Sequence, residues 1–364
     1  MTYNNCTAVS GGCLGTNNRS VVIENSYSTA GTLMDELWTY ADTFDRPIIG
    51  KSRTLASYSR VDREYDALGR VYRESAPCDW TSCTTYWNTY GYDLIDRLTT
   101  ASRPISDSNP TLQSATVYYE GLTTRSVDSQ SKQAQKVMNA AGQLARSQDH
   151  DLYYQSFDYD AFGGVKRVQD SAGNTLQSSN YNLRGMLTGR TDLDMGSWIF
   201  TPNALGETAS QTDAMSQVTS FGYDRLGRLT GRTEAEGTSS WTFGVSSANK
   251  DVGQITALSG PGGYSETWTY NPLARPVSRV INAGGTNYTY NFAYNSIGKL
   301  QQLTYPTSTS SYRLKLLYEY QNSRLIRIKD FNVPTTVFWT ANAANPREQI
   351  TQETLLNGVV SNRK

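Results

Sequence analysis

The sequence predicts an all-β protein built as an array of β-hairpins, and three observations support this class. A heptamer of the form Tyr-Asp-x-x-Gly-Arg-Leu recurs along most of the 364 residues. Tyrosine dominates the aromatic residues, with 25 Tyr against 9 Phe and 7 Trp, and aromatic side chains favour strands. Helical spacing is hard to find, and only residues 34–38 are compatible with a helical turn.

The heptamer returns at a regular spacing. Good copies lie 22 residues apart from Tyr159 to Tyr181 and 27 apart from Tyr65 to Tyr92, a period that indicates a stacked array. Weaker copies fill residues 139–144, 203–207 and 252–255, with a copy carrying an insertion at 40–46 and a short one at 320–325. We expect the structural anchors of the array to be Tyr65, Asp66, Gly69, Arg70, Tyr92, Asp93, Tyr159, Asp160, Gly163, Tyr181, Gly185, Tyr223, Asp224, Gly227, Arg228, Tyr270, Tyr294 and Gly298.

Each part of the heptamer has a local role. The Asp or Asn that follows the tyrosine folds its side chain back onto the backbone two residues on and starts a turn. The glycine supplies the positive φ with which the chain reverses. The next residues, such as Arg70 and Val71, begin the return strand. We expect the arginines to cover tyrosine rings and to pair with the turn acids, in preference to forming an anion-binding ladder.

The number of units predicts the architecture. Ten to twelve units of two strands give roughly twenty strands, and open sheets rarely exceed about ten without curling or splitting. A continuous spiral sheet lined by Tyr and Leu is favoured over a propeller, whose Gly-His and Trp-Asp signatures are missing. We expect a cap-like segment at 1–39, the repeat array at 40–330 and further repeat-like strands at 331–364, where the chain looks truncated.

Composition argues against several functions. Lys+Arg and Asp+Glu are both 33, so zero net charge disfavours nucleic acid or an anionic membrane as the main partner. No apolar run approaches the 18 or so residues of a membrane span. The single histidine, His150, is interpreted as a solvated turn residue. The nucleophile-elbow motif Gly-x-Ser-x-Gly, which would supply a catalytic serine, is missing from the sequence. Asp192 and Asp194 come closest to the pattern of a calcium-binding loop, but we interpret them as residues that cap a turn. From these observations together we expect no catalytic, cofactor or metal site.

The four cysteines form two pairs that are close in sequence. Cys6 lies near Cys13, and Cys78 lies near Cys83. In an exported protein such pairs predict two local disulfides, and four reduced thiols are the alternative. The spacings differ from the usual metal-binding and redox motifs.

The heptamers resemble the RHS family, also called YD-repeat proteins, which includes bacterial polymorphic toxins, shell subunits of insecticidal toxin complexes and teneurins. The resemblance covers residues 40–320, and the segments 118–124 and 349–354 are similar to stretches of bacterial members. It implies a large spiral β-sheet shell around a cavity, which in the toxins holds a cytotoxic domain. No segment here matches the core domain that follows the repeats in those toxins.

These observations and the resemblance predict a non-enzymatic shell segment of a larger secreted or surface bacterial protein. Its partners would be the rest of the parent polypeptide or a cargo toxin domain. The alternative is a carbohydrate- or receptor-binding repeat module, since exposed aromatic faces stack on sugar rings. Open strand edges at the ends of the sheet predict self-association.

Overall fold

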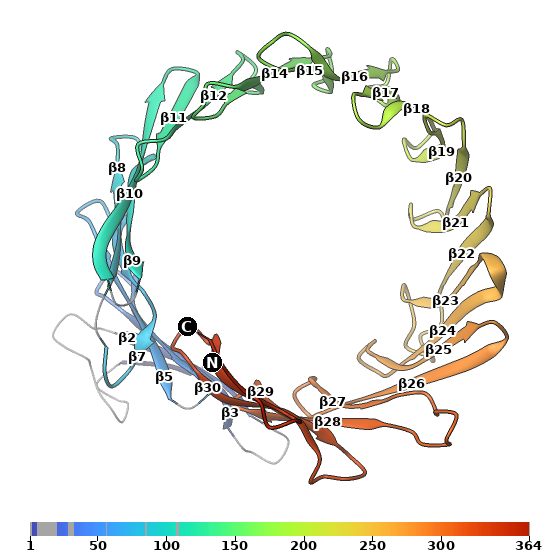
Figure 1. Ribbon diagram of the computed structural model, residues 1–364. Coiled ribbons are helices and arrows are strands. Elements are labelled where there is room, and N and C mark those ends of the chain that lie inside the picture. Colours follow the sequence, from blue (N-terminus) through green and yellow to red (C-terminus); the bar gives the residue numbers. More distant parts are fainter. Residues whose placement is uncertain are drawn as a thin grey trace. The chain divides into compact units, whose positions relative to one another are not determined.

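The computed structural model (Figure 1) describes residues 2–5, 20–27, 33–55, 57–83, 86–106 and 109–363. Contacts divide the chain into unit 1, residues 1–115 with 291–364, and unit 2, residues 116–290. Nearly all regular structure in the described residues is β, which confirms the predicted fold class. No helix in these residues is long and apolar enough to cross a membrane. The boundaries predicted at 39 and 330 stay a prediction.

Unit 1 contains two runs of strands, β1 to β9 and β27 to β32, and within each run a strand pairs antiparallel with the next one along the chain. The exceptions are β7, which pairs with β5, and β8, which pairs with β6. The strands of unit 1 are β1 (Thr2–Asn5), β2 (Ser20–Tyr27), β3 (Leu33–Ala41), β4 (Pro47–Arg53), β5 (Tyr58–Tyr65), β6 (Val71–Ser75), β7 (Cys78–Asp79), β8 (Trp87–Tyr92), β9 (Leu98–Ser106), β27 (Leu300–Thr304), β28 (Lys315–Gln321), β29 (Arg324–Asp330), β30 (Val337–Ala344), β31 (Ile350–Leu355) and β32 (Val360–Asn362).

In unit 2 each strand from β11 to β24 pairs antiparallel with the next, so that the chain runs as successive hairpins (Figure 1). The strands are β11 (Thr123–Val127), β12 (Gln133–Met138), β13 (Leu144–Gln148), β14 (Tyr154–Tyr159), β15 (Val165–Gln169), β16 (Thr175–Tyr181), β17 (Leu187–Asp192), β18 (Gly196–Pro202), β19 (Thr208–Thr212), β20 (Val218–Tyr223), β21 (Leu229–Glu234), β22 (Gly237–Phe243), β23 (Ile255–Gly260), β24 (Tyr264–Tyr270) and β25 (Pro276–Ala283). Two strands span the unit boundary, β10 (Asn109–Glu120) and β26 (Thr286–Tyr294).

The helical turn expected at residues 34–38 is wrong, because these residues lie inside β3. Strand β3 pairs with β2 on one edge and β4 on the other, which satisfies its backbone groups as a strand. Period-two alternation places Trp38 and Tyr40 together in the small core of unit 1, where Val21, Tyr40 and Ile49 are buried. Burial by neighbouring strands therefore outweighs the local spacing.

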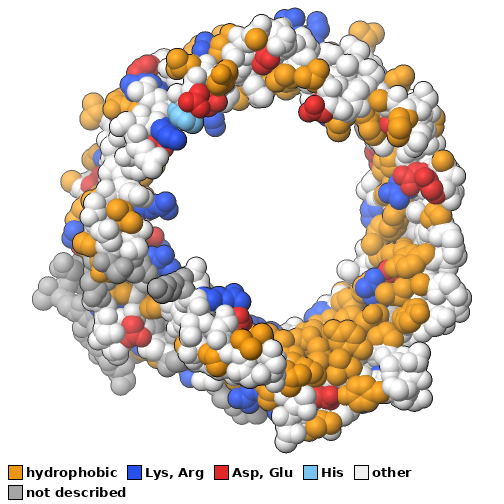
Figure 2. Space-filling model, in the orientation of Figure 1, with side chains coloured by type: hydrophobic (Ala, Val, Ile, Leu, Met, Phe, Trp, Pro, Cys, Tyr) orange, Lys and Arg blue, Asp and Glu red, His pale blue; other side chains and the backbone are white. Residues whose placement is uncertain are grey.

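Unit 2 has no comparable apolar core. Its buried side chains are polar, namely Ser179, Asp251 and Glu266, while its hydrophobic side chains are half-buried or exposed. Figure 2 accordingly shows hydrophobic side chains on the visible surface of the array. A folded domain normally buries apolar faces between two packed layers. In unit 2 the sheet is a single layer, so its order must come from contacts between successive hairpins.

Candidate functional site: the ladder of repeat turns

The tyrosine of each good heptamer is the last residue of a strand, and the turn begins directly after it. Tyr65 ends β5, and the Oδ1 atom of Asp66 then accepts hydrogen bonds from the backbone N–H groups of Leu68 (2.9 Å) and Arg70 (2.9 Å). The Asp66 N–H donates to the Arg70 carbonyl (2.8 Å), and the Gly69 N–H donates to the Asp66 carbonyl (3.0 Å). A bulge between Glu64 and Tyr65 completes this five-residue reversal.

The same side-chain pattern, with bonds to the second and fourth following N–H groups, recurs along both units. It occurs at Asp42, Asp66, Asp93, Asp128, Asn139, Asp149, Asp160, Asp170, Asn182, Asn203, Asp213, Asp224, Asn271, Asn295 and Asn345. Sequence reasoning missed Asp128, Asp149, Asp170, Asp213 and Asn345, because they lack the tyrosine of the heptamer and all except Asp170 also lack its glycine. The detectable signal is the Asp or Asn itself.

The third residue after the turn Asp or Asn always has a positive φ. Gly69, Gly163, Gly185, Gly227 and Gly298 have φ between 74° and 88°, as the heptamer predicts. Other residues also take this conformation, such as Asp96 at 64° and Ala274 at 56°. Glycine avoids a second difficulty at Gly227, where a Cβ would lie 2.9 Å from Glu207 Oε1 of the preceding repeat. The carboxylate of Glu207 ends a flexible side chain that can move aside, so the glycine serves mainly the positive φ of the turn.

The arginine at the sixth position of the heptamer has two contacts. Arg70 Nε lies 2.7 Å from Asp66 Oδ2 of its own turn, and the Arg70 guanidinium lies 4.8 Å from the ring centre of Tyr92 in the next repeat. The pairs Arg97–Asp93 (2.7 Å) and Arg228–Asp224 (2.6 Å) repeat the first contact. The hydrogen bond from the backbone N–H of Arg70 lowers the pKa of the Asp66 carboxyl below its usual value. Desolvation acts in the opposite direction, and the hydrogen bond from the Arg70 guanidinium lowers the pKa further.

The tyrosine hydroxyl connects each repeat to the preceding one, a contact that sequence reasoning missed. Tyr92 donates to the Val71 carbonyl (2.8 Å), and Tyr181 donates to the Val165 carbonyl (2.9 Å). In each case the acceptor is the first residue after the turn of the preceding heptamer. The same bond is made by Tyr65 to Pro47, Tyr159 to Leu144, Tyr223 to Thr208, Tyr270 to Ile255 and Tyr320 to Leu300. The recurring hydroxyls thus join hairpin to hairpin.

One buried carboxylate in unit 2 lies outside the turns. Glu266 on β24 is buried and accepts hydrogen bonds from Arg279 Nε (2.7 Å) on β25 and from the Tyr264 hydroxyl. The Arg279 side chain, against the opposing effect of desolvation, lowers the pKa of Glu266. Because both oxygens are bound by neighbouring side chains, this group is a structural ion pair and offers no free base.

The residues considered for chemistry remain dispersed. His150 lies in the turn that begins at Asp149, with its Nε2 atom 3.3 Å from Asp151 Oδ2. Asp192 caps the turn between β17 and β18 by accepting the Asp194 N–H (3.0 Å). No group of three or more potential metal-ligating side chains occurs in the described ranges.

Cys78 and Cys83 are joined by a disulfide, with a Cα–Cα distance of 5.1 Å. It closes the short loop that follows β7. The other expected pair, Cys6 and Cys13, lies outside the described residues.

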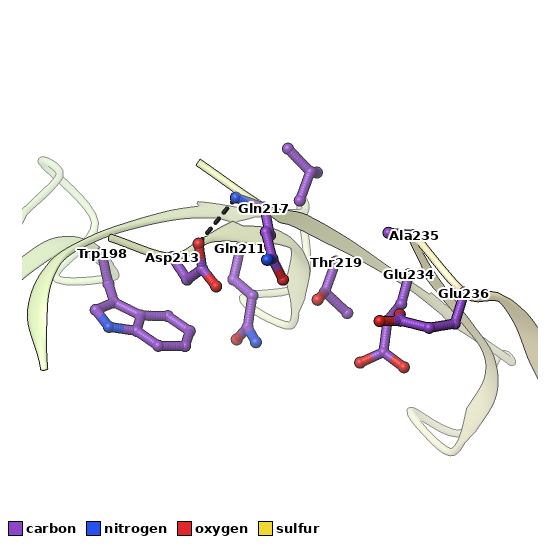
Figure 3. Close-up of a pocket in the computed structure, with 9 residues that line it drawn as sticks. Trp198, Gln211, Asp213, Gln217, Thr219, Glu234, Ala235 and Glu236 are labelled. Carbon is purple, nitrogen blue, oxygen red and sulfur yellow. Dashed lines mark hydrogen bonds between the residues drawn. The ribbon is translucent and has the colours of Figure 1, made fainter. Parts of the chain in front are cut away.

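A polar pocket of about 380 Å³ lies on the face of unit 2 across β18 to β21 (Figure 3). Trp198 lies on one side of it, and Glu234 and Glu236 lie on the other. Gln211, Gln217 and Thr219 lie between them. The indole is tied by its N–H to the Met195 carbonyl (3.2 Å) and stacks on Phe200 at 6.4 Å between ring centres.

Comparisons with known proteins agree with the series of repeated turns described above. The RHS Repeat family model matches residues 203–239, which contain the turns at Asn203 and Asp224. No curated protein matches the chain in a sequence comparison. The fold is similar to that of TcdB2-TccC3 without its hypervariable C-terminal region, with a TM-score of 0.75 and 14% identity over 94% of this chain. The Photorhabdus luminescens Tc holotoxin pore with a mutated TccC3 gives the same TM-score and identity over 95%.

The chain spans only 20% of the length of either solved chain, and at this identity the likeness shows the fold. Together with the family match it confirms the resemblance to RHS/YD-repeat proteins that the heptamers predicted. Residues 203–239 therefore match the RHS Repeat model, and the chain shares the fold of these solved structures.

Proposed function

We propose that this chain is a non-enzymatic wall segment of a larger secreted or cell-surface bacterial protein, and that it encapsulates or displays a toxin or other cargo domain. The observation that carries the proposal is the single-layer construction of unit 2, with polar buried side chains and hairpins joined by tyrosine hydroxyls. A hydrogen-bonded sheet of this kind excludes proteases because its backbone groups are paired. The Cys78–Cys83 disulfide favours an oxidising, extracellular location.

Solution scattering tests the wall. A solid globule of 364 residues has a radius of gyration of about 21 Å, and a single-layer wall of the same mass must exceed this value. A monomer with the radius of a solid globule contradicts the wall. Hydrolase activity that disappears in His150→Ala would contradict the non-enzymatic part.

The cargo part is tested in the natural full-length protein by limited proteolysis. We expect the segment enclosed by the repeats to stay uncut until denaturant unfolds the repeats. A cargo segment that is cut as fast in the native protein as in denaturant contradicts encapsulation, whereas the scattering result would be unaffected.

The pocket of Figure 3 favours glycan binding as a second candidate function. An indole face stacks on a sugar ring, while amide groups donate hydrogen bonds to its hydroxyls or accept them, and carboxylates accept them. We expect glycan-array binding by the native chain that is lost in Trp198→Ala and kept in Trp268→Phe, a change outside this pocket. Equal binding by the native chain and Trp198→Ala contradicts this candidate.

A further inference from the structure

The small core of unit 1 lies on one face of β2, β3 and β4, and the indole of Trp80 packs onto it. The strand register places Val21 opposite Tyr40, and Tyr40 opposite Ile49. Trp80 belongs to none of these strands, because it follows β7. Its ring stacks on that of Tyr40, with 6.3 Å between the ring centres and an angle of 20° between the planes. The indole therefore covers part of the apolar face of these strands.

The same indole helps to enclose Lys51 on β4. The Lys51 Nζ atom lies 4.8 Å from the ring centre of Trp80, 4.5 Å from that of Trp38 and 4.2 Å from that of Tyr58. Three aromatic faces around one ammonium group make a cation–π contact. Desolvation lowers the pKa of Lys51, and the Glu36 carboxylate acts in the opposite direction. Removal of the indole would open the Lys51 ammonium to water and to reagents.

The segment that carries Trp80 lies outside the continuous series of paired strands. Strand β6 pairs directly with β8, and β7 between them pairs with β5 at two positions. The Trp80 N–H adds a backbone hydrogen bond to the Tyr58 carbonyl (2.8 Å). The segment can therefore leave the sheet while β6 stays paired with β8.

The Cys78–Cys83 disulfide closes a loop around Trp80, with a sequence separation of 5 between the two cysteines. A bridge of this kind acts mainly by limiting the conformations of the open chain. For so short a loop the chain-entropy relation gives a shift of about 30-fold toward the closed position. The weak pairing of β7 and the bridge thus act together to hold the indole in place.

We propose that residues 78–83 form a redox-controlled lid: the disulfide keeps Trp80 over the aromatic face of β2 to β4, and reduction releases it. Release uncovers the ring of Tyr40, which is 2% exposed when the lid is closed, and the ammonium of Lys51. The lid is closed in oxidising surroundings outside the cell and opens when the chain meets a dithiol reductant. This device goes beyond the wall function, so either proposal can fail alone.

The opening reaction is thiol–disulfide exchange with a dithiol. Cys83 is more exposed than Cys78, so the thiolate of the reductant attacks the Cys83 Sγ atom. The S–S bond breaks, and Cys78 leaves as a thiolate that takes up a proton. The second thiol of the reductant loses its proton and attacks the reductant sulfur of the mixed disulfide, which releases Cys83. Two electrons and two protons have passed to the bridge, and the reductant leaves as a disulfide.

Acetylation of lysines, mapped by mass spectrometry, measures the lid. The rate at Lys51 is divided by the rate at Lys166, an exposed lysine of unit 2, to correct for reagent consumption. In the oxidised native chain we expect Lys51 to react more slowly than Lys166. Dithiothreitol, or the variant Cys78→Ser/Cys83→Ser, should raise the ratio by up to about 30-fold.

Two tryptophan variants with the disulfide intact separate the lid from a general loss of structure. Trp80→Ala should raise the Lys51 ratio without reduction. The matched control Trp87→Ala removes an indole that lies 4.3 Å from the Arg73 guanidinium, away from the lid, and should leave the ratio unchanged. Amide exchange should accelerate on reduction in peptides covering residues 76–83 and stay unchanged in unit 2.

Four results overturn the proposal. They are equal acetylation of Lys51 and Lys166 in the oxidised chain, a ratio that reduction does not raise, and equal effects of the two tryptophan variants. The fourth is amide exchange that accelerates as much in unit 2 as in residues 76–83, because this result would show general unfolding in place of a local lid.

Discussion

Removing one tyrosine hydroxyl isolates the contact between neighbouring repeats. In Tyr92→Phe the ring is retained, and Arg70 keeps its place over the ring at 4.8 Å. The chain already uses phenylalanine in this way, since Arg228 lies 4.1 Å from the ring centre of Phe243. The substitution therefore removes only the hydrogen bond to the Val71 carbonyl (2.8 Å).

The expected cost is about 1 kcal/mol, the usual net contribution of one intramolecular hydrogen bond. In a repeat array this cost acts mainly on the hairpins that the bond joins. A loss of about 1 kcal/mol raises the equilibrium constant for local opening of these hairpins about fivefold. We therefore expect amide exchange in peptides covering β6 and β8 to accelerate about fivefold, with little change in unit 2.

Tyr288→Phe is the matched control. The Tyr288 residue is 41% exposed, and its hydroxyl has no hydrogen-bond partner among the described residues. We expect exchange in β25 and β26 to be unchanged in this variant. Unchanged exchange of β6 in Tyr92→Phe, or equal acceleration in the two variants, would refute the role assigned to the repeat hydroxyls.

Three further substitutions or treatments test the ladder. Gly227→Ala should destabilise the native chain by about 1–2 kcal/mol in urea unfolding, because the residue has a positive φ and a new Cβ meets Glu207, whereas Gly231→Ala, with open space around it, should be close to neutral. The folded-state pKa of Asp66 is lowered, so its contribution to stability is present above the unfolded pKa near 3.9 and is lost as pH falls through the folded value. Asp66→Asn keeps a side-chain oxygen for the turn but has no group that binds a proton in this pH range. Below about pH 4 the melting temperature of this variant should therefore fall less steeply than that of the native chain. Parallel curves of melting temperature against pH contradict this prediction. Free-thiol titration of the denatured, unreduced protein should find no thiol from Cys78 or Cys83, and reduction should cost about 2 kcal/mol because the loop is short.

The turns were the most predictable part of the fold because their interactions lie within five residues. An Asp or Asn, the N–H groups two and four residues on, and a residue at positive φ are all encoded side by side. The turns that the sequence search did not find are just as local, but they use other residues at the same positions. The turns at Asp149 and Asp213 have Leu152 and Ser216 at positive φ in place of glycine, so a search for tyrosine and glycine passes over them.

The sequence by itself determined the hairpins, their order and their period, since each turn is stabilised locally. Only the tertiary structure decided which groups meet across repeats: the hydroxyl of Tyr92 with a carbonyl 21 residues earlier, and Asn322 with Thr54, 268 residues away. Such contacts depend on how far each hairpin is twisted and displaced relative to the next. That geometry is set by many strands together and by no single segment.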